Sequence, residues 1–425
     1  GSGVPSNAFA GAAGQPGFWN SLAPGSSGSF AMMGLNGASS GVTITRQGNG
    51  FASSGLGSGG TDYQRLIRDY SDAFQPGGVS QVQLNGLDAG LYRLVVYAHL
   101  PGAAGTFEDN GFTGYHTNYI SASIGVQDAG YATTSGAPGA DVFVEGKTHQ
   151  WFTLNVPAGA PAVTIRSSAD TGYSLSHAAL NGFQLVKYDG SRLYVKQNAN
   201  GLNTGKDWAN AFTDLQTALR FAKESQGAIT EVWVAAGTYY PATTDRTKSF
   251  KMIDGVKIIG GFSGTETSPA ERIAGNTTYL SGDLGISRNI TDNSYRIVDA
   301  SGVNSSAVLD SVTVVWGNGN GTPGVYDAGS GLWASNGSPT VRNVTFSNNR
   351  GDRGGAVNVE YGGPTFANCT FTGNSCTWDG GAIRWVGDNT GWFPPVLKIA
   401  NCEFIGNSAT QYGGAVMTYN GPAWI

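Results

Sequence analysis

Two aspartates stand just before paired glycines in a repeated segment of the chain, and carboxylates in such a place could serve a polysaccharide hydrolase or lyase. Asp352 and Asp379 occupy this position in consecutive copies, with Arg353 close by. Clustered carboxylates, or a Ca²⁺ site beside a basic residue, supply that chemistry. The third copy has Gln411 and Tyr412 there, so the acidic column does not continue. Because carboxylates beside tight turns are commonly solvated structural residues, the sequence favours a protein without catalysis over an enzyme.

The same segment carries groups that could stack on sugar rings. Arg353, Trp378 and Tyr412 lie within two residues of the paired glycines in successive copies, and Trp385 and Trp392 are nearby. If the copies stack, the first three form a flat strip suited to cation–π contacts and to packing on sugar faces. These five residues are the candidate carbohydrate-binding residues. The alternative is that the strip shields the backbone or packs under an insert, since large aromatic side chains are usually placed for burial.

A metal site has one candidate. Glu108 and Asp109 are expected in a glycine-flanked loop after a strand, where their carboxylates could hold a structural Ca²⁺. The alternative is a polar loop. All four histidines precede residue 190 without metal-ligand spacing, so the second half has no histidine base or zinc ligand unless the halves meet. No other cofactor is expected.

The composition limits the class of partner. The 425 residues carry a formal charge of −5 and no run of lysine and arginine, which argues against a nucleic-acid partner. No apolar stretch reaches the roughly 18 residues of a membrane span. Only 12% of residues are charged while 11% are aromatic, so Ser, Thr, Asn and Gly must coat the surface, as is typical of β-rich secreted proteins.

A sequence pattern repeats at steps of 25 and 33 residues in the last third of the chain. A unit of this length with three short strands, stacked on itself, predicts a parallel β-helix. One aligned position should stack phenylalanines in the interior at about 4.8 Å. Another should place asparagines at a corner, in the left-handed conformation, with amides bonded from rung to rung. The two predicted ladders are Phe346, Phe371 and Phe404, and Asn349, Asn374 and Asn407.

The three cysteines lie in this region, so one at least must be unpaired. Cys369 and Cys402 share an aligned position. Parallel-stacked Cβ atoms lie about 4.8 Å apart, which is longer than a relaxed disulfide prefers, so buried free thiols are expected.

One helix is predicted at residues 213–223. Thr213 is the expected N-cap, and Gln216, three residues on, would complete a capping box. The helix should cover the N-terminal end of the β-helix, because an open solenoid core needs a lid. Its apolar stripe is expected to comprise Phe212, Leu215, Leu219 and Ala222.

The chain therefore reads as an all-β protein of two domains. Residues 1–190 contain short alternating strands between Gly, Pro and Asn turns, which predicts an antiparallel β-sandwich of the jelly-roll type. Residues 191–425 are expected to form a right-handed parallel β-helix that continues beyond the given chain.

Several motifs of the second half occur in a familiar order and spacing: Asn203-Thr-Gly-Lys-Asp-Trp208, Val232-Trp-Val-Ala-Ala-Gly-Thr-Tyr239 and Leu280-Ser-Gly-Asp283. With them, residues 192–425 resemble the bacterial surface β-helix proteins described as choice-of-anchor Q or polymorphic-outer-membrane-protein-like. The resemblance implies a secreted or surface-anchored protein and supplies no catalytic residues. The end of the first half, Ala179–Val186, is similar to galactose-binding-like jelly rolls of bacterial secreted proteins.

These observations predict an extracellular bacterial surface protein with structural or adhesive duties, assembling into a fibre or surface layer. The alternative is a secreted protein that binds or degrades polysaccharide. Converging carboxylates in a cleft would favour the enzyme, and a smooth shaft with an aromatic strip would favour adhesion. Expected partners are polysaccharide, other surface proteins, and further copies of the chain, since Ile425 falls within a repeat and an open solenoid end is a template for added strands.

Overall fold

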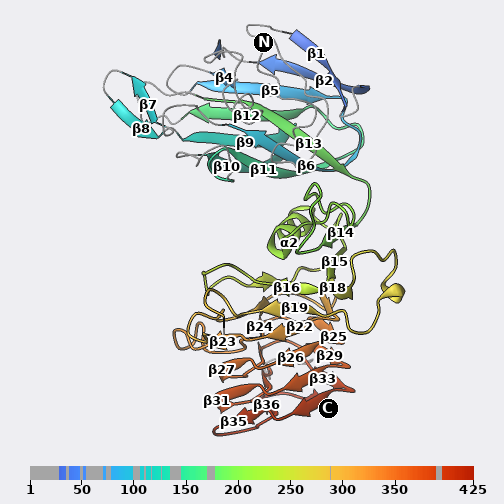
Figure 1. Cartoon of the computed structure of the whole chain (residues 1–425), viewed down its shortest axis with the longest axis vertical. Coiled ribbons are helices and arrows are strands. Elements are labelled where there is room, and N and C mark those ends of the chain that lie inside the picture. The colour runs from blue at the N-terminus through green and yellow to red at the C-terminus, as the bar shows by residue number, and fades with distance from the viewer. Residues whose placement is uncertain are drawn as a thin grey trace. The chain divides into compact units, whose positions relative to one another are not determined.

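Strands are the predominant regular element in the described parts of both halves of the chain (Figure 1). The computed structural model describes residues 28–34, 38–47, 51–53, 70–72, 78–98, 106–109, 112–115, 117–125, 127–134, 145–169, 178–287, 289–388 and 395–425. Two compact units divide the chain, Gly1–Asp189 and Gly190–Ile425. In the described ranges, no helix has the length and apolar character needed to cross a membrane.

The first unit contains two antiparallel sheets. Strands Val79–Asn85 and Asn118–Ile124 alternate buried and half-buried residues, as expected for a sheet with one face on the core, whereas Gly90–Tyr97 is buried along nearly its whole length. The six-stranded sheet has the order β1 (Gly28–Met33), β2 (Ser39–Gln47), β5 (Val79–Asn85), β12 (Val163–Ala169), β9 (Asn118–Ile124) and β10 (Gln127–Thr134). The three-stranded sheet has the order β11 (His149–Val156), β6 (Gly90–Tyr97) and β13 (Gly182–Tyr188). Two further pairs are β3 (Phe51–Ser53) with β4 (Tyr70–Asp72), and β7 (Thr106–Asp109) with β8 (Phe112–Tyr115).

Side chains from both of these sheets form one apolar core. Leu94 and Phe152 of the three-stranded sheet pack with Ile120 and Ile165 of the six-stranded sheet, and all four are buried. This packing confirms the antiparallel arrangement expected from the sequence. The assignment to the jelly-roll class stays a prediction.

The second unit is a stack of parallel sheets, which confirms the predicted parallel β-helix. From residue 308 onward the chain passes through four sheets in each turn, here named PB1 to PB4, rather than the three strands expected; the described residues among 231–307 contribute no strand to PB3. PB1 comprises β14 (Arg192–Val195), β15 (Glu231–Ala235), β18 (Lys257–Phe262), β21 (Val308–Asp310), β25 (Thr340–Arg342), β29 (Thr365–Ala367), β33 (Leu397–Ala400) and β37 (Ala423–Trp424). PB2 comprises β16 (Gly237–Tyr239), β19 (Thr278–Ser281), β22 (Thr313–Val315), β26 (Thr345–Ser347), β30 (Thr370–Thr372) and β34 (Glu403–Ile405).

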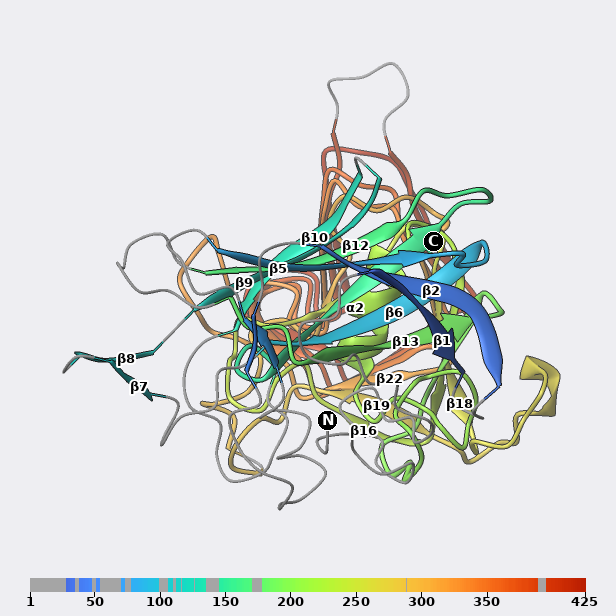
Figure 2. The same cartoon turned by 90° about the horizontal axis from the view of Figure 1, so that it is seen from above.

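The other two sheets complete the turns from residue 308 onward, and successive turns overlie one another when viewed along the stack (Figure 2). PB3 comprises β23 (Asn318–Gly319), β27 (Arg350–Arg353), β31 (Ser375–Asp379) and β35 (Ser408–Ala409). PB4 comprises β17 (Phe250–Lys251), β20 (Val298–Asp299), β24 (Leu332–Ser335), β28 (Val357–Glu360), β32 (Ile383–Val386) and β36 (Val416–Tyr419).

The phenylalanine ladder runs through the interior of PB2. The rings of Phe346 and Phe371 stack with centroids 5.0 Å apart, and those of Phe371 and Phe404 with centroids 4.9 Å apart. The planes differ by only 4° and 5°. Because the strands pair in register at these residues, each ring lies directly over the next.

The asparagine ladder lies at the corner between PB2 and PB3. Asn349 Nδ2 donates to Asn374 Oδ1 at 3.1 Å, and Asn374 Nδ2 donates to Asn407 Oδ1 at 2.9 Å. The expected left-handed conformation belongs to the residue before each ladder position, namely Asn348, Gly373 and Gly406. The reason is geometric: the turn is completed one residue earlier, which leaves the ladder amides facing inward to bond the backbone.

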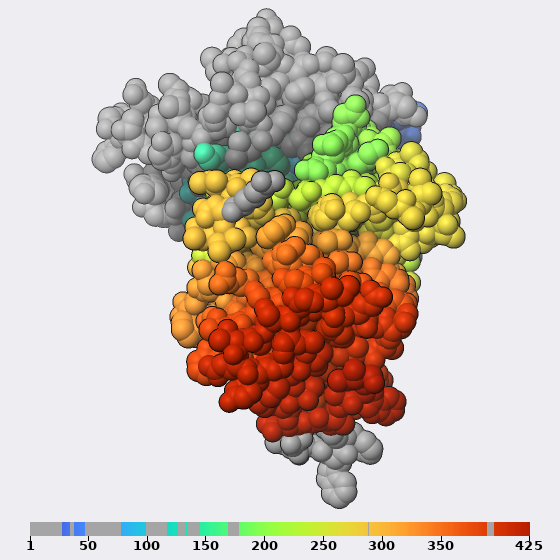
Figure 3. Space-filling view, turned by 60° about the horizontal axis from the view of Figure 1, so that its bottom comes forward, coloured from blue at the N-terminus to red at the C-terminus, as the bar shows by residue number. Residues whose placement is uncertain are grey.

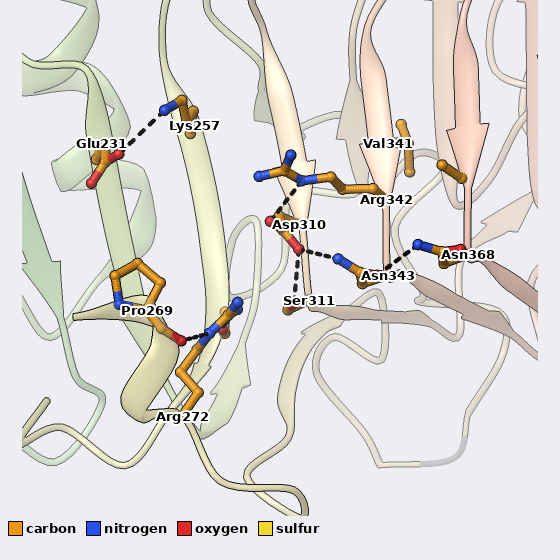
Figure 4. A network of polar contacts seen from close by, with 12 residues as sticks. Glu231, Lys257, Pro269, Arg272, Asp310, Ser311, Val341, Arg342, Asn343 and Asn368 are labelled. Atoms are coloured by element: carbon orange, nitrogen blue, oxygen red, sulfur yellow. Dashed lines mark hydrogen bonds and ion pairs between the residues drawn. The ribbon is translucent and has the colours of Figure 1, made fainter.

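A second, exposed asparagine ladder marks the corner between PB1 and PB2 (Figure 4). Asn343 and Asn368 have positive φ, and their side chains bond to each other at 3.4 Å. Asn343 also donates to the carboxylate of Asp310, which receives further bonds from Ser311 and Arg342. Burial alone would raise the pKa of Asp310, but these hydrogen bonds outweigh it and lower the pKa below its ordinary value.

The single α-helix in the described ranges, α2 (Leu215–Glu224), packs against β14, β15 and β17 at the first turns of the stack. Its N-cap is Asp214, not the predicted Thr213: the Asp214 carboxylate accepts from the backbone of Gln216 and Thr217. The Gln216 side chain bonds the carbonyl groups of Pro241 and Ser249 instead of closing a capping box. A carboxylate is the stronger acceptor for these exposed amides, which explains the shift by one residue. A short 3₁₀ helix, η2 (Pro269–Glu271), lies in a connection.

We expect Gly381→Ala to lower the free energy of unfolding by about 3 kcal/mol or more, since overpacking a rigid site is costly. An added Cβ would lie 2.1 Å from the Gly414 carbonyl oxygen and 2.5 Å from that of Ser408. The matched control is Gly406→Ala, where φ is +60° and the Cβ meets nothing within 4 Å. It should cost only the left-handed penalty of about 1–2 kcal/mol. Urea unfolding measures both, and equal losses would contradict the steric argument.

Candidate functional site

Three of the five candidate carbohydrate-binding residues, Arg353, Trp378 and Tyr412, lie where PB3 turns into PB4. In β31, Cys376 is buried, Thr377 and Trp378 are both exposed, and Asp379 is buried again. Two successive exposed residues break the alternation of a strand because a β-bulge sets Thr377 and Trp378 opposite the single residue Asp352. The bulge therefore directs Trp378 outward.

The bulge also changes the register expected from the sequence. Arg353 pairs with Asp379, and Asp379 bridges to Tyr412, so these three share a column. Trp378 lies one residue before that column and not in it. The predicted continuous strip of Arg353, Trp378 and Tyr412 is therefore wrong. The sequence contains a sign of the bulge: the ladder asparagine and the first glycine of the pair are five residues apart in the first copy and six in the second.

Trp378 and Tyr412 are nevertheless neighbours on adjacent rungs. The backbone N–H of Tyr412 donates to the Trp378 carbonyl oxygen at 3.0 Å. Their side chains are 49% and 62% exposed, so both present ring surface to solvent. In the space-filling view of Figure 3, the described residues of the last turns, coloured red, form one uninterrupted surface. Among the described residues no ring or cation–π contact joins Arg353, Trp378 and Tyr412.

Trp385 cannot contribute to this surface. Its side chain is fully buried, and its indole N–H donates to the Gly362 carbonyl oxygen at 2.7 Å. The position falls on the inner face of β32, because residues of a strand alternate between faces and Arg384 takes the outer one. Trp392 lies outside the described residues.

A polar cluster on the outer face of PB4 supports the corner between PB3 and PB4, directly after Trp378. Asp379 Oδ2 accepts from Arg384 Nε at 3.2 Å and from the Tyr419 hydroxyl at 2.7 Å. Arg384 also donates to Asn358 at 3.0 Å and to Glu360 at 3.2 Å. The hydrogen bond to Asp379 raises the pKa of Tyr419. The cluster links three turns and leaves Asp379 Oδ1 as a buried oxygen without a hydrogen-bond partner.

These supporting residues were not identified from the sequence. Asn358 and Arg384 occupy paired positions in β28 and β32, three residues after the second glycine of each pair. Aligning the outward positions of these strands would have found both. The contact of Arg384 with Asp379 depends on the corner between PB3 and PB4, which residue spacing does not specify.

The candidate hydrolytic pair, Asp352 and Asp379, is not formed. The bulge places Arg353 opposite Asp379, and Asp352 instead accepts from the Thr377 hydroxyl at 3.0 Å. Asp379 is 6% exposed and ion-paired with Arg384. A general acid and base must both reach a substrate, so this arrangement does not provide the converging carboxylates that an enzyme would require.

The expected calcium ligands lie in a strand and not in a loop. The backbone of Glu108 and Asp109 belongs to β7, where the two residues pair with Thr113 and Phe112 of β8. Their side chains fall outside the described part of the structure. Within the described part, no group of three His, Cys, Asp or Glu residues is placed to hold a metal ion.

Comparisons with known proteins give limited similarity. No curated protein matches the chain. Among solved structures, a GH87 α-1,3-glucanase catalytic domain variant in complex with tetrasaccharides is 12% identical with a TM-score of 0.31, covering 91% of this chain and 61% of that one. A GH87 catalytic domain in complex with nigerose is 14% identical with a TM-score of 0.29, covering 90% and 62%. The chain thus spans about three fifths of these domains, and similarity at this level assigns no activity.

One family model matches a short stretch of the second unit. Residues 368–384 are similar to the Chlamydia polymorphic membrane protein repeat. This stretch begins at the left-handed Asn368, includes Phe371, Asn374 and Trp378, and ends at Arg384. It therefore covers most of one turn of the β-helix, including the bulge and the residue that anchors Asp379.

Proposed function

We propose that this chain is part of an extracellular bacterial surface protein in which a β-helix scaffold has structural and adhesive roles and binds polysaccharide through Trp378 and Tyr412. The observation that carries the proposal is the bulge in β31, which exposes Trp378 one rung away from the exposed Tyr412. Bulges often re-aim a side chain at a functional position. The similarity of residues 368–384 to a repeat of a membrane-protein family supports a surface role.

The physical basis of this proposal is a rigid support beneath an exposed aromatic surface. The ion pairs of Arg384 with Asp379 and Glu360 fix the turn from both sides. A preorganised aromatic surface loses little conformational entropy when a ligand packs on it. Two ring faces on adjacent rungs suit a flat, extended ligand such as a sugar chain. The β-sandwich of the first unit, as a jelly-roll binding module, belongs to the same proposal.

We expect a glycan array to identify a polysaccharide that the chain binds, and Trp378→Ala to weaken that binding at least about tenfold, since truncating a central aromatic contact costs roughly 1.4 kcal/mol or more. The matched control is Tyr361→Ala, which removes an aromatic residue of similar exposure, 51%, from a different corner. Binding curves for parent and variants measure the effect. No glycan bound by the parent, or an unchanged profile for Trp378→Ala, would contradict the proposal.

A further inference from the structure

Two cysteines occupy the same corner of consecutive turns. Cys369 and Cys402 lie between the paired residues Ala367 and Ala400 on one side and Thr370 and Glu403 on the other. The backbone N–H of Cys369 donates to Cys402 Sγ at 3.4 Å. Both side chains are free thiols. The sulfur of Cys402 therefore lies within hydrogen-bond distance of the rung that carries Cys369.

The spacing of the rungs brings these cysteines within reach of a covalent bond. Neighbouring parallel strands lie about 4.8 Å apart, inside the Cα separations of about 4.4–6.8 Å found in disulfides. The Cβ atoms of stacked residues must approach by roughly 0.5–1 Å to reach the usual disulfide range. Each cysteine directly follows a left-handed corner residue, Asn368 or Asn401, and so lies outside the strands themselves. The corner can adjust without disrupting a strand ladder.

The two thiols differ in the way that thiol–disulfide exchange requires. In this chain Cys402 lies in the last turn, where it is half-buried and a small oxidant can reach it, whereas Cys369 is covered by the turns on both sides and is 1% exposed. Cys369 Sγ donates to the carbonyl oxygens of Ala367 and Val341. The neighbouring Cys369 thiol and backbone N–H lower the pKa of Cys402, whereas Cys402 and burial raise the pKa of Cys369. The accessible thiol is therefore the nucleophile, and the buried one is placed to resolve the product.

We propose that Cys369 and Cys402 form a reversible disulfide that links two successive turns of the β-helix, made by exchange with a small disulfide such as oxidised glutathione. The Cys402 thiolate attacks one sulfur of glutathione disulfide, forms a mixed disulfide and releases one glutathione thiolate. Cys369 Sγ then attacks Cys402 Sγ and breaks the mixed disulfide, and its proton passes to the departing glutathione. Two protein thiols are oxidised, and one glutathione disulfide is reduced to two thiols.

The third cysteine provides an internal reference. Cys376 lies in PB3, where it pairs with Gly351 and Ala409, so it belongs to a different column. Burial raises the pKa of its thiol to about 11. It should therefore stay reduced under conditions that oxidise the other two.

The test uses the full chain treated with oxidised glutathione at pH 8, quenched with N-ethylmaleimide and mapped by mass spectrometry after digestion. Of the three thiols, two should be lost in a Cys369–Cys402 crosslink and one should remain at Cys376. The variant Cys376→Ser should form the same crosslink and retain no thiol. The variant Cys402→Ser should retain both of its thiols.

Three results would overturn the proposal. They are three free thiols in the treated parent, a glutathione adduct at Cys402 that persists without a crosslink, and a disulfide between two chains. Because the parent chain alone yields the crosslink map, the test does not depend on the folding of either variant. It is also independent of any glycan measurement, so it can fail while the proposed polysaccharide binding holds.

Discussion

Replacing Phe371 by alanine is expected to lower the free energy of unfolding by about 4 kcal/mol, since truncating a buried phenylalanine costs roughly 3–5 kcal/mol. The Phe371 side chain is fully buried, and its ring stacks on two neighbours with centroids 5.0 Å and 4.9 Å away. The variant leaves a cavity in the middle of the ladder and removes both aromatic contacts at once. Urea unfolding followed by far-UV circular dichroism measures the loss.

The matched control for this prediction is Thr372→Ala, one residue further along β30. Thr372 faces outward from the same strand and is only half-buried. Substitutions at such positions usually change stability by no more than about 0.5 kcal/mol. A loss at Phe371 no larger than the loss at Thr372 would mean that the stacked rings do not stabilise the β-helix.

The two ladders could be predicted because the spacing of identical residues in a repeat indicates which residues pair between successive turns. When identical residues recur at one spacing and the fold stacks them, local alternation alone decides which of them face inward. Phe346 and Phe371 are 25 residues apart, and the structure pairs them directly. The 33-residue step to Phe404 does not disturb this pairing, since one extra residue forms the bulge in β31 and the others fall in the connection from β32 to β33.

The candidate site was less predictable because it depends on a single inserted residue. An alignment at 25 residues pairs Arg353 with Trp378, whereas the bulge pairs Arg353 with Asp379. A shift of one residue exchanges the two faces of a strand, so Trp378 is exposed to solvent and Asp379 is buried. The burial of Trp385 follows from the same alternation, since its neighbour Arg384 faces outward.

Short-range chemistry explains the smaller differences between expectation and structure. Thr213 and Asp214 both can cap a helix, and sequence spacing does not rank them. The left-handed positions fall at Asn348, Gly373 and Gly406 because the next residue must direct an amide inward. The exposed ladder of Asn343 and Asn368 shows the other use of asparagine, in which one residue supplies both the turn and the hydrogen bond.

Replacing Asn374 by alanine should have the other large effect, a loss of about 3–5 kcal/mol in the free energy of unfolding. The Asn374 side chain is fully buried and donates to the Phe346 carbonyl oxygen at 2.9 Å and to Asn407 Oδ1 at 2.9 Å. Its Oδ1 accepts from the backbone N–H of Asn349 at 3.0 Å and from the side chain of Asn349 at 3.1 Å. Each buried polar group left without its partner costs about 1–3 kcal/mol.

The control for the buried ladder is Asn368→Gly in the exposed ladder of the same turn. Asn368 has φ of +54°, which glycine adopts freely, and water can replace its bonds to Asn343 and Asn401, so the cost should stay below about 1 kcal/mol. Hydrogen exchange gives a local readout, because the amide of Asn349 should lose protection in Asn374→Ala and keep it in Asn368→Gly. Equal stability losses in the two variants would show that the corner is held by backbone pairing alone, and the asparagines would then be turn residues without a structural ladder.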